Sequence, residues 1–122
     1  MSSLVLEITS HHFESIIEHH TIVFIFFGTN ECLNSTEFER AYEVAAVENQ
    51  SILFGWINVE KQPSLVKQMQ ICSAPHLVVF KQGIAIYSEA GWVSASTLNE
   101  LVGQALAVDT NQIYQQINAS EY

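Results

Sequence analysis

The 122-residue sequence has few basic residues and no long hydrophobic run. Four lysines and arginines stand against thirteen acidic residues, and the formal net charge of −9 at pH 7 would repel a nucleic-acid backbone or an anionic membrane surface. The longest apolar run, Ile22 to Phe27, is far shorter than the roughly 20 residues of a membrane-spanning helix. The composition therefore argues against nucleic-acid and membrane binding.

Cysteine is also scarce, since the sequence contains only Cys32 and Cys72. Two cysteines are too few for a disulfide scaffold, and no third or fourth ligand suggests a zinc site around them. The histidines are adjacent or two helical turns apart rather than at i, i+4, which indicates a solvated helix end: His11, His12, His19 and His20. We therefore expect no metal site and no cofactor. With no basic segment ahead of the first apolar residues, we expect a cytoplasmic protein.

The hydrophobic pattern predicts one α/β domain with the element order βαβαβαββα. The run at 22–27 has no polar face and is typical of a strand covered on both sides. Between 35 and 48 the pattern is helical, with one apolar face formed by Phe38, Ala41, Tyr42, Ala45 and Ala46. Further strands are predicted over 4–8, 51–59, 77–80 and 84–87, and further helices after Thr9 or Ser10, at Pro63 and around 98–106.

Local signals support these boundaries. Pro63 suits the first turn of a helix, and Gly83 in Lys81-Gln82-Gly83 supplies the positive φ of a hairpin turn. Thr97 and Glu100 have the spacing of a capping box for the last helix. We expect a domain over 1–108, followed by a polar tail, 109–122, that is either helical or disordered.

Four local motifs, in this element order, resemble the thioredoxin family over about residues 4–107. They are the buried strand ending in Phe26-Phe27 with a cysteine shortly after it, Asn58-Val-Glu-Lys-Gln-Pro63, Cys72-Ser-Ala-Pro75 before Leu77-Val-Val-Phe80, and Gly91 before the last helix. The resemblance implies a central mixed sheet of about five strands with helices on both faces. It also implies that Pro75 is the family's cis-proline beside the active-site loop, and that the partners are proteins or peptides.

The expected active site departs from the family's Cys-x-x-Cys. Counting from the strand, with Ile25 at the position of the family's buried acid, puts Glu31 at the nucleophile position. The apolar face of the following helix instead favours Cys32 as the first cysteine and Ser35 in place of the second. We prefer this Cys-x-x-Ser interpretation, which requires a loop one residue longer than usual.

A Cys-x-x-Ser site can attack a disulfide but cannot resolve the mixed disulfide that it forms. Cys32 would be the nucleophile, and Ser35 could donate a hydrogen bond to its thiolate. The start of a helix favours the thiolate, whereas Glu31, Glu37 and Glu39 oppose it. We therefore expect monothiol exchange or capture of protein partners. The alternative is a non-catalytic adaptor of the same fold that binds peptide in its groove.

Other residues are expected around this site because of the resemblance. The peptide groove would include Ala74, Pro75 and His76 from one loop, with Gly91 and Trp92 from another. Cys72 could act as a second thiol, or it could simply fill space in its loop. His76 could bind peptide or protonate a leaving thiolate near neutral pH, or it could simply be exposed. The oligomeric state stays open.

Overall fold

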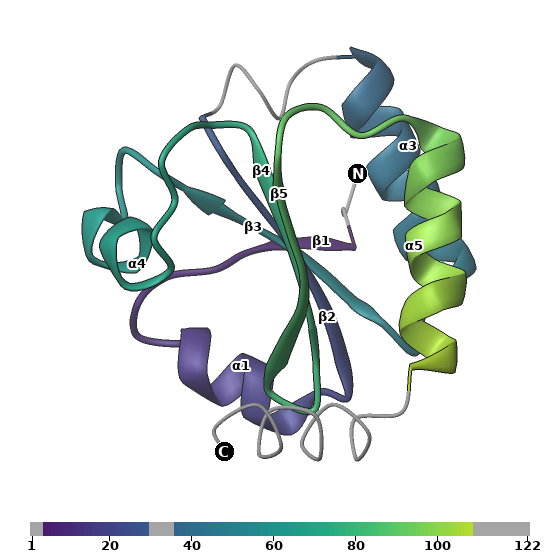
Figure 1. Ribbon diagram of the computed structural model, residues 1–122, viewed down its shortest axis with the longest axis horizontal. Coiled ribbons are helices and arrows are strands. Elements are labelled where there is room, and N and C mark those ends of the chain that lie inside the picture. Colours follow the sequence, from purple (N-terminus) through teal and green to yellow (C-terminus); the bar gives the residue numbers. More distant parts are fainter. Residues whose placement is uncertain (1–3, 30–35, 109–122) are drawn as a thin grey trace, which may run out of the picture.

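A five-stranded mixed sheet lies between two layers of helices in the computed structural model, which describes residues 4–29 and 36–108 (Figure 1). The order of elements is the βαβαβαββα order predicted from the sequence. The elements are β1 (Val5–Glu7), α1 (Phe13–His19), β2 (Ile22–Gly28), α3 (Thr36–Glu48), β3 (Leu53–Asn58), α4 (Pro63–Gln68), β4 (His76–Lys81), β5 (Ile84–Ala90) and α5 (Ala95–Ala107).

The strand order in the sheet is β1-β3-β2-β4-β5. β1 and β2 each pair in parallel with β3, whereas β4 is antiparallel to both β2 and β5. β2 lies in the middle of the sheet, and every one of its residues is buried, as predicted for a strand that is covered on both sides. Helices α3 and α5 cover one face, and α1 and α4 cover the other (Figure 1).

Side chains of β2 alternate between two hydrophobic cores, because successive residues of a strand point to opposite faces. Phe24 and Phe26 pack in the core beneath α3 and α5. Val23, Ile25 and Phe27 pack in the core beneath α1 and α4. This alternation decides which residues of β2 lie under the candidate site.

The predicted hairpin turn at Gly83 and the predicted helix start at Pro63 are both present. Gln82 and Gly83, with φ of 52° and 80°, form the two-residue turn between β4 and β5. Pro63 is the first residue of α4. The Oδ1 atom of the buried Asn58 accepts hydrogen bonds from the backbone N–H groups of residues 60 and 61, at 2.9 and 3.2 Å, where β3 ends.

The prediction that Thr97 and Glu100 form a capping box at the start of α5 is wrong. The N-cap is Ser94, whose Oγ accepts the backbone N–H of Thr97 at 3.2 Å. The helix begins at Ala95, so Thr97 already lies in its first turn and donates to the cap instead of forming it. None of the helices among the described residues is long and apolar enough to cross a membrane.

Candidate functional site

Three segments that are distant in sequence meet at one edge of the sheet, where β2 ends, β4 begins and β5 ends. Phe27 of β2 pairs with His76 of β4, and His76 pairs with Ala90 of β5. Helix α3 starts at this same edge (Figure 1). Cys32 and Ser35, the predicted catalytic pair, lie outside the described residues, which stop at Thr29 and resume at Thr36.

The two loops expected to form the peptide groove are directly connected. The backbone N–H of Gly91 donates to the carbonyl oxygen of Pro75 at 2.8 Å. Gly91 has a φ of +108°, a conformation that side chains other than glycine's rarely adopt. The Ala74–Pro75 peptide bond is cis, the geometry that the resemblance implied. Pro75 and Gly91 are therefore neighbours.

Trp92 extends this edge toward α3. Its ring centroid lies 5.8 Å from that of Phe38 and 6.3 Å from that of Phe26, and the Phe26 and Phe38 rings are stacked at 4.1 Å. Although Trp92 contacts both rings, 56% of it is exposed. The stack thus holds a largely exposed indole in a defined position.

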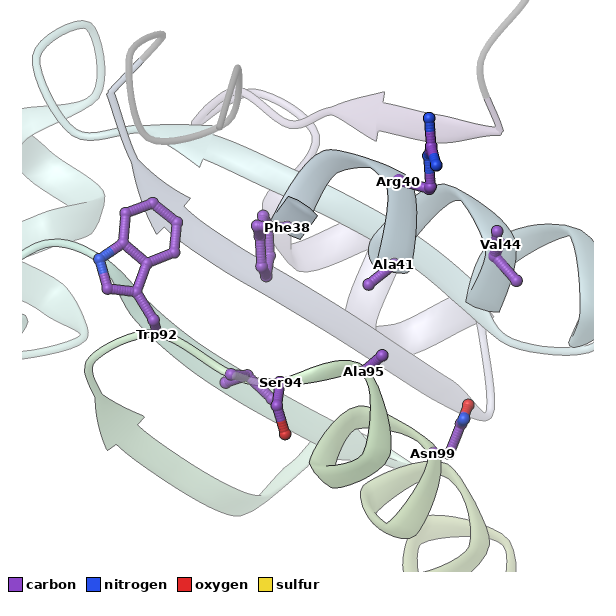
Figure 2. A pocket seen from close by; sticks show the side chains of 9 residues that line it. Phe38, Arg40, Ala41, Val44, Trp92, Ser94, Ala95 and Asn99 are labelled. Carbon is purple, nitrogen blue, oxygen red and sulfur yellow. The ribbon is translucent and has the colours of Figure 1, made fainter. Parts of the chain in front are cut away.

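Beside Trp92, an open groove of about 880 Å³ runs between α3 and α5 (Figure 2). We call it the α3–α5 groove, and its apolar lining consists of Phe38, Ala41, Val44, Trp92, Val93 and Ala95. This groove was not predicted from the sequence. One signal was available, because Val44 and Val47 fall outside the buried face of α3 and yet are apolar.

His76 does not share a surface with Trp92. In the strand pairing, His76 is opposite Phe27, whose side chain belongs to the α1–α4 core, whereas Trp92 packs against the α3 side. The Nε2 atom of His76 lies 2.7 Å from Ser88 Oγ, and its buried Nδ1 has no hydrogen-bond partner among the described residues. Burial lowers the pKa of His76, and the nearby Glu89 partly opposes this.

Ile25 is not beneath the candidate site, contrary to the sequence-based assignment. It belongs to the α1–α4 core, and the residue under the start of α3 is Phe26, stacked on Phe38. If Phe26, and not Ile25, takes the position of the family's buried acid, the same count along the chain ends one residue later. It would then reach Cys32 in place of Glu31, without a longer loop, and Cys32 is the residue that the apolar face of the following helix also favours.

The buried face of α3 supports the same register. Phe38, Tyr42, Ala45 and Ala46 are all buried, as predicted, whereas Ala41, the fifth residue of the predicted face, is half-buried and Arg40 is exposed. The hydroxyl of Tyr42 lies 2.7 Å from the carbonyl oxygen of Gly55 and 3.0 Å from that of Phe24. Burial raises the pKa of this phenol well above its usual value, so Tyr42 acts as a neutral donor and not as a base.

Cys72 and Ala74 are both exposed near the beginning of β4. The Cys72 thiol is 3.7 Å from the carbonyl oxygen of Gln70, a weak contact two residues away along the chain. Within residues 4–29 and 36–108, no group of three or more potential metal-ligating side chains is close enough to hold an ion.

Comparisons with known proteins agree with this geometry. The thioredoxin family model matches residues 4–104. A Streptomyces coelicolor protein described as "Putative thioredoxin 2" is 28% identical over 108 residues, which are 88% of this chain and 81% of that protein.

Solved thioredoxin structures share the fold. A mutant thioredoxin from Halobacterium salinarum superposes with a TM-score of 0.76 at 18% identity, covering 89% of this chain and 97% of that one. A Plasmodium falciparum thioredoxin gives 0.73 at 23% identity, covering 82% and 98%. Since the family model spans residues 4–104, most of the sequence, and solved thioredoxins share the fold, the chain belongs to the thioredoxin family.

Proposed function

We propose that this redox-related, thioredoxin-like protein captures protein disulfides through a single thiol, Cys32. The Cys32 thiolate attacks one sulfur of a partner's disulfide, the partner's S–S bond breaks, and the second partner sulfur leaves as a thiolate that takes a proton from solvent. Ser35 cannot attack the mixed disulfide, but it can donate a hydrogen bond to the thiolate. Release requires a further thiol, either an external small-molecule thiol or one within the partner.

The observation that carries this proposal is the agreement of two independent counts on Cys32. One count runs along the chain from Phe26, which lies beneath the start of α3. The other runs back from the buried face of α3, beginning at Phe38. Both support Cys32 as the residue at the family's nucleophile position.

Phe26 should also slow thiol–disulfide exchange at Cys32, because its apolar ring lies where a proton acceptor would assist the thiol. The described buried residues include no carboxylate and no imidazole, so no buried group beneath α3 can accept the thiol proton. Glu39 and Glu43 add negative charge to α3, which disfavours a nearby thiolate. We therefore propose slow attack and a long-lived mixed disulfide, which suits capture better than rapid turnover.

The partner polypeptide would lie along Ala74 and Pro75 on one side and Gly91 and Trp92 on the other. The hydrogen bond from Gly91 to Pro75 supports this arrangement because it joins the two segments. We leave the His76 side chain out of the peptide site, since it packs on the opposite side of the sheet from Trp92. Cys72 remains a candidate second thiol, and residues 1–108 remain the proposed domain.

A non-catalytic adaptor is the second candidate function. It is favoured by Phe26, which puts an apolar ring where a proton acceptor would assist the thiol, and by the exposed Trp92, which suits binding without chemistry. In this alternative, an extended partner segment binds in the same place and Cys32 stays reduced.

The experiment that separates the two candidates measures the alkylation rate of Cys32 against pH in a Cys72→Ser background. The same variant is then incubated with oxidised glutathione and with a synthetic disulfide-bonded peptide, and the products are analysed by mass spectrometry. Capture predicts a mixed disulfide that persists without added thiol and is absent in Cys32→Ala. A thiol pKa at or above about 8.5 with no mixed disulfide would leave only the adaptor.

A further inference from the structure

The α3–α5 groove is an apolar surface that the described part of the domain leaves open. Its exposed lining includes Trp92, at 56% exposure, and Val44, at 48%. Figure 2 shows the Trp92 ring at one end of the groove and Val44 and Asn99 at the other, with Phe38 and Ala41 between them. An exposed apolar patch with a tryptophan at one end is typical of a protein interaction surface.

The groove is held open by packing and does not depend on a partner to form. Phe38 is stacked on Phe26, and Trp92 packs against both rings. Helix α5 begins at Ala95, beside these rings, and the hydrogen bond to the N-cap Ser94 fixes its first turn. Because these groups are already ordered, binding of a partner would cost this chain little conformational entropy.

The charge around the groove indicates what kind of segment it can take. Among the described residues, Arg40 is the one charged residue in the lining of the groove, and Glu39 and Glu43 lie beside Arg40 and Val44. Over their whole length, the two helices carry five glutamates and this one arginine. A segment with apolar anchors and basic flanks would therefore be attracted to it. A second copy of this chain, at −9, would be repelled, and the tail 109–122 contains Asp109 and Glu121 but no lysine or arginine.

We propose that the α3–α5 groove is a docking site for a basic, apolar-anchored segment of a partner protein. An apolar side chain of the segment packs on Trp92 and Val44, and its lysines or arginines face Glu39 and Glu43, the acidic residues beside Val44. This docking does not require Cys32, so it stands whether the protein captures disulfides or acts only as an adaptor.

The test uses the full chain with Cys32→Ser and Cys72→Ser, which removes covalent capture, and two fluorescein-labelled peptides without cysteine. The peptides share one leucine- and tyrosine-containing core and differ only in having lysine or glutamate flanks. Fluorescence anisotropy should show that the lysine peptide binds at least about ten-fold more tightly at low salt, and that 300 mM NaCl weakens it.

Val44→Asn and Val47→Asn form a matched pair on α3. Both valines are about half exposed, at 48% and 57%, but only Val44 lines the groove. Val44→Asn should raise the Kd of the lysine peptide at least about five-fold, whereas Val47→Asn should leave it within about two-fold. Trp92→Ala should weaken binding as Val44→Asn does, and circular dichroism checks that each variant is folded.

Several results would overturn the proposal. One is equal weakening by both valine variants, and another is no binding by the lysine peptide. A dimer seen by ultracentrifugation and abolished by Val44→Asn would make a second copy the occupant. Tighter peptide binding by at least ten-fold after truncation at Val108 would make the tail the occupant. None of these outcomes depends on the thiol experiment, because the tested chain has no cysteine.

Discussion

The two faces of the sheet are both well packed, but they differ in what they leave exposed. On the α3–α5 face, Phe24, Phe26, Phe38, Tyr42, Phe54 and Trp92 form a series of ring contacts that ends at an exposed indole. On the α1–α4 face, branched aliphatic side chains surround one ring contact, between Phe13 and Phe80 at 5.8 Å. The first face therefore carries an exposed aromatic ring beside an open groove, and the second mainly supports the fold.

The largest effect should come from deleting a ring in the aromatic series. Phe26→Ala should lower the free energy of unfolding by about 3 to 5 kcal/mol, because it leaves a cavity in a fully buried position. It should also shift the indole N–H resonance of Trp92, which packs on Phe26. Urea unfolding and a ¹H–¹⁵N spectrum measure the two effects.

Ile25→Ala provides the control from the other face. Its side chain is equally buried, so stability should also fall, by about 2 to 5 kcal/mol. The Trp92 resonance should stay in place, because Ile25 belongs to the α1–α4 core. An equal shift of Trp92 in both variants would contradict the separation of the two faces.

The next effect concerns the buried hydroxyl of the α3–α5 face. Tyr42→Phe removes the donor to the carbonyl oxygens of Gly55 and Phe24, and should lower the free energy of unfolding by about 1 to 2 kcal/mol. Tyr87→Phe, at a partly exposed tyrosine on β5, should change it by less than about 0.5 kcal/mol. If the two variants lost the same stability, the hydroxyl of Tyr42 would not anchor α3.

A somewhat smaller effect is expected where α5 begins beside the groove. Ser94→Ala removes the cap on Thr97 and should cost about 1 kcal/mol in thermal or urea unfolding. Ser96→Ala, two residues later, keeps the bond from the Thr97 N–H to Ser94 and removes only the 3.3 Å contact between the Ser96 and Ser94 hydroxyls, so its loss should be smaller. A loss at Ser96 equal to the loss at Ser94 would show that the cap is not what stabilises the start of α5.

The smallest effect should be on the pH dependence of the free energy of unfolding, and it comes from His76 on the α1–α4 side. Burial holds the pKa of His76 below its usual value of about 6.5, so the unfolded chain binds the proton more tightly. The stability contributed by neutral His76 is present above about pH 6.5 and decreases as the pH falls through this value toward the folded pKa. His76→Asn should flatten this part of the stability curve.

The matching measurement is an NMR titration of the His76 ring, with an expected midpoint below about 6.5. Ser88 Oγ, next to Nε2, and Glu89 on the same strand are the described groups closest to this titration. A midpoint above 6.5 would mean that Glu89 outweighs burial, and the pH dependence would then have the opposite sign.

Much of the fold followed from local patterns in the sequence. Apolar positions 38, 42, 45 and 46 repeat with the period of a helix and are all buried in α3. Gly83 marked the hairpin turn, and Pro63 marked the start of α4. The predicted capping box of α5 failed because the helix begins earlier than Thr97 indicated: Ser94, three residues before Thr97, is the N-cap.

The candidate site was less predictable because it depends on faces of the sheet. The continuous apolar run of β2 has no polar side, so its sequence did not show that Phe26, and not Ile25, lies beneath α3. His76 and Trp92 seemed to belong to one groove because both follow the motifs of the site. The strand pairing separates them onto opposite sides.

By itself, the sequence determined the family, the order of helices and strands, and the acidic net charge, because periodicity, turn residues and net charge are local or additive properties. The tertiary structure decided which side chains meet, since strand alternation and helix packing bring together residues that are distant along the chain. It placed Phe26 under Phe38 and left Trp92 exposed beside Val44, and so formed the α3–α5 groove.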